Sequence, residues 1–251
     1  MVQAERRLKG GGQNSACIDS KDVRVETGAM MKSRSRSIVP AIAGVALLAL
    51  ASHASAHPHI FAEARLDVMV DANRNVAALR NLWRFDDLFS STVLVEFDQN
   101  KDLKLDDPEL QAISDTIYKS LAEFDYFQLV TANGREVEIT APKQLIATFE
   151  DNQLVILFET TPKQQLKLAG QVDFGVYDPT FYTAIDFTED DQMSVATLDS
   201  ACTRKVVRPD PDEAIAQNQD KLTEEFFNQP GGNDMSKIFA TRLEINCPKE
   251  G

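Results

Sequence analysis

The chain has 251 residues, and its 39 acidic and 26 basic side chains give a formal net charge of −13 at pH 7. This excess of negative charge repels phosphate, so it argues against nucleic acid and anionic lipid surfaces as partners. Hydrophobic residues make up 43% of the chain, which is enough for a folded domain with its own core.

The first part of the chain predicts an export signal. Basic residues after Met31 precede the apolar run IVPAIAGVALLALA and a small-residue ASA sequence that fits a signal peptidase site. The run is shorter than the roughly 20 apolar residues of a membrane-spanning helix. We expect a non-native or disordered leader at 1–29, a cleaved signal peptide at 30–56 and a single periplasmic domain at 57–251, without stable membrane insertion. An uncleaved N-terminal anchor is the alternative.

Cleavage there leaves 195 residues with 18 basic and 35 acidic side chains, a net charge of −17. The remaining cysteines are Cys202 and Cys247, in a compartment that favours disulfides. We therefore expect a disulfide between them that ties the C-terminal segment to the rest of the domain. A shared metal is the alternative, although there is no CxxC spacing and no nearby histidine.

The periodicity of apolar residues predicts the elements of the first half. Alternation over 60–70 and 76–85 predicts a hairpin around the turn DANRN. Helical spacing follows on both sides of an acidic loop, within an insertion at 86–125. The first helix, capped by Asp86 or Asp87, has an apolar stripe of Leu88, Phe89, Val93 and Phe97, and the second, starting at Asp107, has one of Leu110, Ile113, Ile117 and Leu121.

The second half reads mainly as strands. Asn133-Gly134 and Asp151-Asn152 each predict a hairpin bend, and Asp178-Pro179 separates two further extended runs. A helix at 212–229, stopped by Pro-Gly-Gly, and a strand ending near Cys247 complete the chain. The predicted fold class is α+β: a mostly antiparallel β-sheet with an inserted EF-hand-like helix-loop-helix and a C-terminal helix and strand.

The acidic loop FDQNKDLKLDDPEL has the spacing of a calcium-binding loop. An EF-hand places oxygen ligands at positions 1, 3, 5, 9 and 12, with a backbone carbonyl at position 7. Numbered from the first aspartate, these are Asp98, Asn100, Asp102, Asp106 and Glu109, with Lys104 at position 7. The pattern predicts a Ca²⁺ site of weak affinity, on the order of 10⁻⁴ to 10⁻³ M, with a structural role.

One position departs from the calcium-binding pattern. Position 6, where glycine normally makes the sharp turn, is Leu103. A Cβ disfavours positive φ by roughly 1 to 2 kcal/mol, so the affinity should fall or the loop should bend differently. A loop that keeps the turn without the metal, and a plain acidic surface, are the alternatives.

The expected mature N-terminus, His-Pro-His, predicts a second metal site. His57 would offer its amine and ring, and His59 projects to the same side of an extended chain. Such ligands suit Cu²⁺, Ni²⁺ or Zn²⁺, with Glu63 as a nearby acidic partner. Pro58 has no N–H and so excludes the square-planar amino-terminal site. The alternatives are an exposed terminus and ring donors that pin the first strand.

Several segments resemble a known family. HPHIF, NLWRFDDLFS, the acidic loop, FDYFQLV and GVYDPTFYTAIDF together are similar to the bacterial periplasmic family called domain of unknown function 1007. The resemblance implies a periplasmic component of a transport system, often encoded beside nickel, cobalt or zinc transporters. The residues that match recurrent family positions are His57, His59, Trp83, Asp86, Tyr177, Asp178 and Tyr182. Leu103 departs from the glycine usual in the acidic loop.

Enzyme chemistry has little support in the sequence. There is no GxSxG, HExxH, P-loop or dinucleotide motif, and the two histidines after the signal lie at one end. We therefore expect a non-enzymatic periplasmic protein that binds divalent metal (Zn²⁺, Ni²⁺, Co²⁺ or Cu²⁺) for a transition-metal transport system. Its expected partner is an inner-membrane metal permease or ABC transporter. The alternative is an interaction or scaffold protein whose only metal is a structural Ca²⁺.

Overall fold

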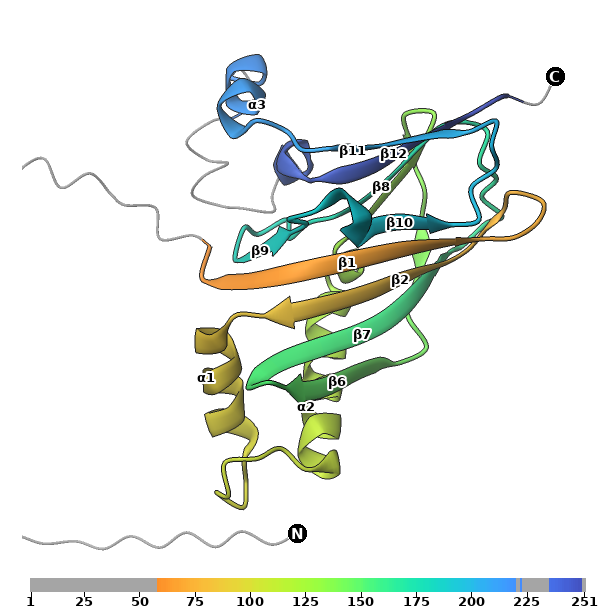
Figure 1. Ribbon diagram of the computed structural model, residues 1–251. Helices are drawn as coiled ribbons and strands as arrows, with labels where there is room; N and C mark the ends of the chain where they lie inside the picture. Colours follow the sequence, from red (N-terminus) through yellow and green to blue (C-terminus); the bar gives the residue numbers. More distant parts are fainter. Residues whose placement is uncertain (1–57, 220–221, 223–234, 250–251) are drawn as a thin grey trace, which may run out of the picture. The chain divides into compact units, whose positions relative to one another are not determined.

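The described part of the chain is built around two β-sheets (Figure 1). The computed structural model describes residues 58–219, 222 and 235–249, within a unit that spans Ala54–Gly251. The predicted leader, signal peptide and His57 lie outside the described residues. Within them, no helix has the length and apolar character needed to cross a membrane.

The first sheet has the strand order β10-β1-β2-β7-β5, with β6 also paired to β7 and β9 to β1. Its strands are β1 (Ile60–Val70), β2 (Val76–Phe85), β5 (Ile139–Thr140), β6 (Leu145–Glu150), β7 (Gln153–Pro162), β9 (Thr183–Asp186) and β10 (Met193–Ala196). The predicted β1–β2 hairpin is confirmed. The pairings of β9 and β10 with β1 are parallel.

A side-chain acceptor fixes the turn of the β1–β2 hairpin. Asp71 Oδ1 accepts the backbone N–H groups of Asn73 and Asn75, both at 2.8 Å, and Asp71 Oδ2 accepts the Asn75 amide at 2.9 Å. These hydrogen bonds from Asn75 favour the charged carboxylate and lower the pKa of Asp71.

The second sheet has the order β11-β12-β8-β3-β4 and is antiparallel throughout. Its strands are β3 (Gln128–Ala132), β4 (Arg135–Glu136), β8 (Gly170–Val176), β11 (Thr203–Val207) and β12 (Arg242–Cys247). The predicted disulfide is confirmed: Cys202, just before β11, is bonded to Cys247, the last residue of β12. It therefore joins the ends of two neighbouring strands.

The inner faces of both sheets contribute side chains to one hydrophobic core. Along β1, every second residue from Ala62 to Val68 is buried, as the alternation of a half-buried strand requires. The fully buried side chains include Trp83 from the first sheet and Phe174 and Ile245 from the second. Trp83 lies with its ring centroid 5.0 Å from that of Phe158 and 5.8 Å from that of Phe127.

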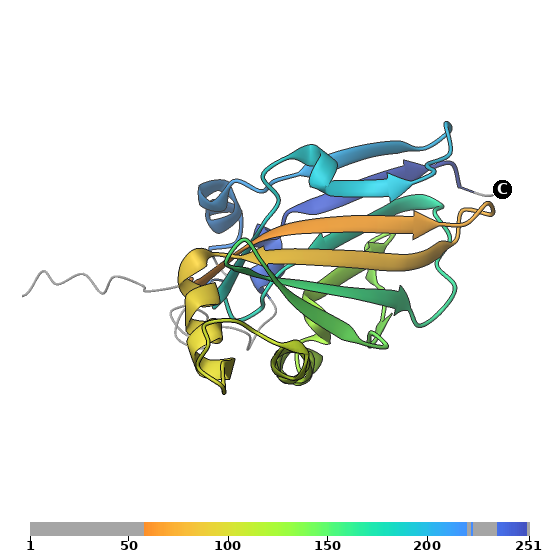
Figure 2. The ribbon, with the colours of Figure 1, turned by 60° about the horizontal axis from the view of Figure 1, so that its bottom comes forward.

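Two helices follow the first hairpin: α1 (Asp87–Phe97) and α2 (Asp107–Ala122). Both lie at the β6–β7 end of the first sheet (Figure 2). Ser90 Oγ of α1 accepts the N–H of Leu154 in β7, and Ser114 Oγ of α2 accepts the N–H of Ala147 in β6, each at 2.9 Å. Buried hydrogen bonds therefore anchor both helices to one hairpin.

The two predicted helices on either side of the acidic loop are confirmed, but one residue of the predicted apolar stripes is not buried. The stripe of α2 is on the core side, as expected, with Ile113 and Leu121 buried. On α1 the structure buries Val93 but leaves Leu88 78% exposed, so the inclusion of Leu88 in the buried stripe was wrong. Leu88 therefore lies on the solvent side of α1, while Val93 lies on the core side.

The remaining elements are short. They are η1 (Asp125–Phe127), η2 (Asp190–Gln192), α3 (Pro211–Gln217) and η3 (Met235–Phe239). The helix expected over 212–229 corresponds to α3, which ends at Gln217; residues 220–221 and 223–229 of that prediction lie outside the described residues. Both predicted hairpin bends are confirmed, since Asn133, Gly134, Asp151 and Asn152 all have positive φ.

Candidate functional site

The loop of residues 98–106 joins α1 to α2 and contains most of the predicted calcium ligands. Asp98, the first of them, follows α1 and is 8% exposed. Its Oδ1 accepts the backbone N–H groups of Lys101 (2.7 Å) and Asp102 (3.2 Å), and its Oδ2 accepts that of Leu103 (2.8 Å). One buried carboxylate therefore gathers three successive backbone amides.

Leu103 takes the backbone conformation that glycine usually supplies. Its φ is 62°, in the left-handed region, and its side chain is 73% exposed. A residue with a Cβ pays roughly 1 to 2 kcal/mol for this conformation. Because Asp98 accepts the N–H of Leu103, the turn is retained despite that cost. The loop bends as a glycine at this position would bend it.

Glu109 closes the loop from the side of α2. The residue is 4% exposed, and its Oε1 accepts the N–H of Gln99 at 2.7 Å. Its Oε2 accepts the N–H of Asp106 at 2.9 Å, while Asp106 Oδ1 accepts the N–H of Glu109 at 3.1 Å. This reciprocal capping box starts α2 and brings the last predicted ligand back over the beginning of the loop.

The middle of the loop is exposed. Asn100 Oδ1 accepts the N–H of Asp102, and Asp102 Oδ1 accepts the N–H of Lys104, each at 2.9 Å. Among the residues that the structure describes, no group of three or more His, Cys, Asp or Glu side chains is placed to hold a metal ion. The predicted ligands thus share one loop, and their oxygens are engaged by the backbone amides of that loop.

The N-terminal end of β1 brings together segments that are far apart in the sequence. The N–H groups of His59 and Ile60 both donate to the carbonyl of Tyr182, at 2.9 and 3.2 Å. The ring centroids of His59 and Tyr182 are 4.9 Å apart. The HPHIF and YDPTFY segments therefore meet here.

Two aspartates fix this end of β1. Asp86 Oδ2 accepts the N–H of Phe61 and its Oδ1 accepts the N–H of Phe89, both at 2.9 Å, so one carboxylate caps α1 and holds β1. Asp178 accepts the N–H and the hydroxyl of Thr180 and the N–H of Thr183, at 2.6 to 2.9 Å. Both aspartates therefore order the backbone around the start of β1.

The structure does not bring Glu63 to His59. Both lie along the extended chain that starts β1, and four residues of a strand span about 13 Å. The Oε1 of Glu63 instead accepts the Nε2 amide of Gln192 at 2.5 Å. Because His57 lies outside the described residues, Glu63 as the acidic partner of the two N-terminal histidines stays a prediction.

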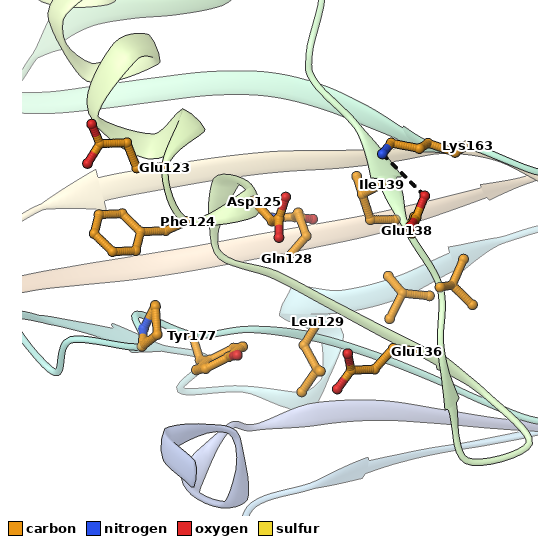
Figure 3. A pocket seen from close by; sticks show the side chains of 13 residues that line it. Glu123, Phe124, Asp125, Gln128, Leu129, Glu136, Glu138, Ile139, Lys163 and Tyr177 are labelled. Atoms are coloured by element: carbon orange, nitrogen blue, oxygen red, sulfur yellow. Dashed lines mark hydrogen bonds and ion pairs between the residues drawn. The ribbon is translucent and has the colours of Figure 1, made fainter. Parts of the chain in front are cut away.

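An acidic pocket that the sequence reasoning missed lies beside β3 (Figure 3). It has a volume of about 410 Å³, and Phe124, Gln128, Leu129 and Tyr177 contribute to its walls. Lys163 pairs with Glu138 at 3.2 Å within the pocket, and Glu136 pairs with Lys237 at 2.7 Å. The charged residues that line it are Glu123, Asp125, Glu136, Glu138 and Lys163. This excess of carboxylates favours cations over anions in the pocket.

The backbone beside this pocket is unusual. Asp125, Tyr126 and Phe127 all have φ between 48° and 59°, so three consecutive residues with a Cβ are left-handed. The Tyr126 ring is buried near Tyr118, with 5.4 Å between the centroids. Burial raises the pKa of the Tyr126 hydroxyl, and its hydrogen bond with Tyr118 raises it further. Aromatic packing against the core therefore holds the segment in this conformation.

Two proteins resemble the chain over much of their length. One is an uncharacterized protein of Haemophilus influenzae, 23% identical over 195 residues that cover 76% of this chain and 91% of the relative. The other is an uncharacterized 15.5 kDa protein in the trpE 3′ region of Spirochaeta aurantia. It is 21% identical over 119 residues, which cover 47% of this chain and 85% of the relative.

A family model also matches the chain. It extends over residues 42–247 and therefore includes the acidic loop, the N-terminal end of β1 and both cysteines of the disulfide. The chain belongs to the family described as protein of unknown function (DUF1007).

Proposed function

We propose that this protein is a non-enzymatic accessory protein of the bacterial periplasm that binds a divalent cation in the loop Asp98–Glu109. The observation that supports this proposal is the left-handed backbone conformation of Leu103, whose N–H donates to the buried carboxylate of Asp98. An EF-hand places glycine at this position for the same sharp turn. In this proposal α1, the loop and α2 form an EF-hand-like unit.

The oxygen chemistry of the loop suits a hard cation such as Ca²⁺. Calcium takes six to eight oxygen ligands, and a carboxylate oxygen can accept an N–H group and bind a cation at once because it has more than one lone pair. Asp98 and Glu109 would supply buried oxygens, while the exposed Asn100, Asp102 and Asp106 would turn toward the ion. Lys104 would contribute its carbonyl.

The cation would act as a structural brace. Through Ser90 and Ser114, α1 and α2 are already fixed to the β6–β7 hairpin, so an ion in the loop would tie the free ends of both helices together. For a dissociation constant of about 0.5 mM, 5 mM Ca²⁺ would stabilise the folded protein by about 1.4 kcal/mol. For a domain of this size that is a rise of roughly 3 to 6 °C in Tm.

Thermal unfolding with increasing Ca²⁺ tests this proposal. The variant Asp98→Asn keeps an oxygen that can accept N–H groups but loses the charge, and it should lose the Ca²⁺-dependent rise in Tm. Glu96→Gln is the matched control, because Glu96 is an exposed acid on α1 outside the ligand set. Equal Ca²⁺ responses of the wild type and Asp98→Asn, or no response of the wild type, would contradict the cation loop.

A second candidate function is delivery of a transition metal to an inner-membrane metal permease or ABC transporter. The exposed position of His59, at the end of β1 where the family segments meet, favours it. In this proposal His57 and His59 bind Zn²⁺, Ni²⁺, Co²⁺ or Cu²⁺ through their rings.

Metal analysis separates the two candidates. Protein purified without chelators is analysed for bound metals, and Zn²⁺, Ni²⁺, Co²⁺ and Cu²⁺ are titrated into wild type and a His57→Ala/His59→Ala variant. Transition-metal binding that the double variant loses supports delivery, and equal binding by both proteins contradicts it. A Ca²⁺ response alone leaves the structural cation as the function.

A further inference from the structure

A second cavity, of about 600 Å³, is lined in part by β9 and the start of β1. These two strands run side by side (Figure 1). The lining of the cavity comes from β9, the end of β8, η3 and the residues before β12, so both sheets contribute. Most of its wall is apolar and includes Phe61, Val176, Phe181, Ile185 and Phe239. The rings of Phe181 and Phe239 are 5.7 Å apart. Its volume is in the range of cavities that hold small organic molecules.

A buried hydroxyl in the lining has no partner. Ser236 is 2% exposed, and its Oγ forms no hydrogen bond in the part of the chain that the structure describes. Buried hydroxyl groups are nearly always hydrogen-bonded, because an unpaired one has lost its hydration. Since Ser236 also lines the cavity, a molecule bound there would complete its hydrogen bonding.

The charges of the lining are negative. Asp178 is buried, and Thr180 and Thr183 occupy its oxygens with hydrogen bonds. Asp186, at the end of β9, is exposed. Its side chain makes no hydrogen bond or ion pair within the described ranges 58–219, 222 and 235–249, while its backbone belongs to the β1–β9 pairing. No basic residue is among the described lining residues, so these residues supply one available carboxylate and no positive charge.

We infer that this cavity binds a small amphipathic organic cation. An aromatic or aliphatic body would lie against Phe181 and Phe239, and an ammonium group would face Asp186. A hydroxyl or carbonyl of the same molecule would pair with Ser236 Oγ. The inference is independent of the cation loop at 98–109, because no residue of that loop lines the cavity.

A matched set of four probes tests the inference. Tyramine combines an aromatic ring, a hydroxyl and an ammonium group. 4-Ethylphenol lacks the charge, phenethylamine lacks the hydroxyl, and 3-(4-hydroxyphenyl)propionate reverses the charge. Each is titrated into the ¹⁵N-labelled protein, and the dissociation constant is taken from amide shifts of residues 183–186 and 236–241. Tyramine should bind about 5- to 10-fold more tightly than 4-ethylphenol and phenethylamine. The anion 3-(4-hydroxyphenyl)propionate should bind most weakly of the four.

Two variants assign the contacts. Asp186→Asn should remove the preference for tyramine over 4-ethylphenol, and Ser236→Ala should remove the preference for tyramine over phenethylamine. Asp191→Asn is the control, because Asp191 is an exposed acid on η2 that does not line the cavity. It should leave all four affinities unchanged.

Several results would overturn the inference. They are an absence of shifts at the cavity residues, binding of the anion as tight as that of tyramine, and preferences that survive both variants. Tighter binding of the peptide acetyl-Lys-Phe-Phe-amide than of tyramine at the same residues would assign the cavity to a protein partner instead. Concentration-dependent dimerisation that tyramine does not reverse would assign it to a second copy of the chain.

Discussion

Replacement of Leu103 by glycine should stabilise the protein. Leu103 has a φ of 62° and a side chain that is 73% exposed, so its removal loses little packing. Glycine removes the roughly 1 to 2 kcal/mol cost of the left-handed conformation. It adds about 0.4 to 1 kcal/mol of conformational entropy to the unfolded chain. The expected net gain in the free energy of unfolding is therefore about 0.5 to 1 kcal/mol.

Urea unfolding, followed by the fluorescence of the single Trp83, measures this gain. The buried Trp83 reports the core, so both proteins share one signal. Lys104→Gly is the matched control, because Lys104 is the exposed neighbour but does not have positive φ. It should lower stability, as glycine normally does. Lys101→Gly should resemble Leu103→Gly, because the φ of Lys101 is also 62°.

The reasoning fails if Leu103→Gly is no more stable than the wild type while its fold is unchanged. It also fails if Lys104→Gly gains as much, because the gain would then not depend on the backbone conformation. If the loop binds Ca²⁺ as proposed, Leu103→Gly should bind it more tightly, since less strain opposes the bound turn.

Three further predictions concern other parts of the molecule. Removal of Ca²⁺ by a chelator should lower the Tm of the wild type by roughly 3 to 6 °C and leave that of Asp98→Asn unchanged. Reduction of the Cys202–Cys247 disulfide, which closes 45 residues, should lower the free energy of unfolding by about 4 kcal/mol in the chain-entropy estimate. Hydrogen bonds from Asn75 lower the pKa of Asp71, so Asp71 stabilises the fold above its ordinary pKa of 3.8 and loses this effect as the pH falls through the lowered value. Urea unfolding of the wild type and Asp71→Asn should therefore differ at pH 6 and converge in acid.

Each of these has its own contradicting result. A chelator effect that Asp98→Asn shares would place the ion elsewhere. For the disulfide, Cys202→Ser/Cys247→Ser measured with and without reductant controls for the reductant itself, and a variant as stable as the oxidised protein would contradict the estimate. For Asp71, a difference from Asp71→Asn that persists undiminished into acid would rule out titration of this carboxylate as its cause.

Local signals predicted much of this fold. Asn133-Gly134 and Asp151-Asn152 tolerate positive φ, so both hairpin bends were visible in the sequence. The apolar spacing of α2 and its start at Asp107 were equally local. The spacing of the acidic loop likewise placed the buried Asp98 and Glu109 at its two ends.

Features that depend on distant segments were not predictable in the same way. The parallel pairings of β9 and β10 with β1 join residues more than 100 positions apart, and no local pattern encodes such a register. The acidic pocket combines Glu123, Glu138 and Lys163 from three separate segments. Their individual charges are plain in the sequence, but their proximity follows only from the sheet topology. Leu88 shows the opposite error of a local pattern. Its helical spacing predicts a buried side chain, but the structure leaves it exposed.

The place of β12 in the second sheet constrains the order of folding. β12 pairs with β11 on one side and β8 on the other, and it is synthesised after every other strand of that sheet. Until residues 242–247 are in place, β8 and β11 have no common neighbour, and each presents an open edge. The second sheet can therefore close only when the last strand of the chain pairs, and a partner that shields the open edge of β8 until then would protect the unfolded chain from aggregation.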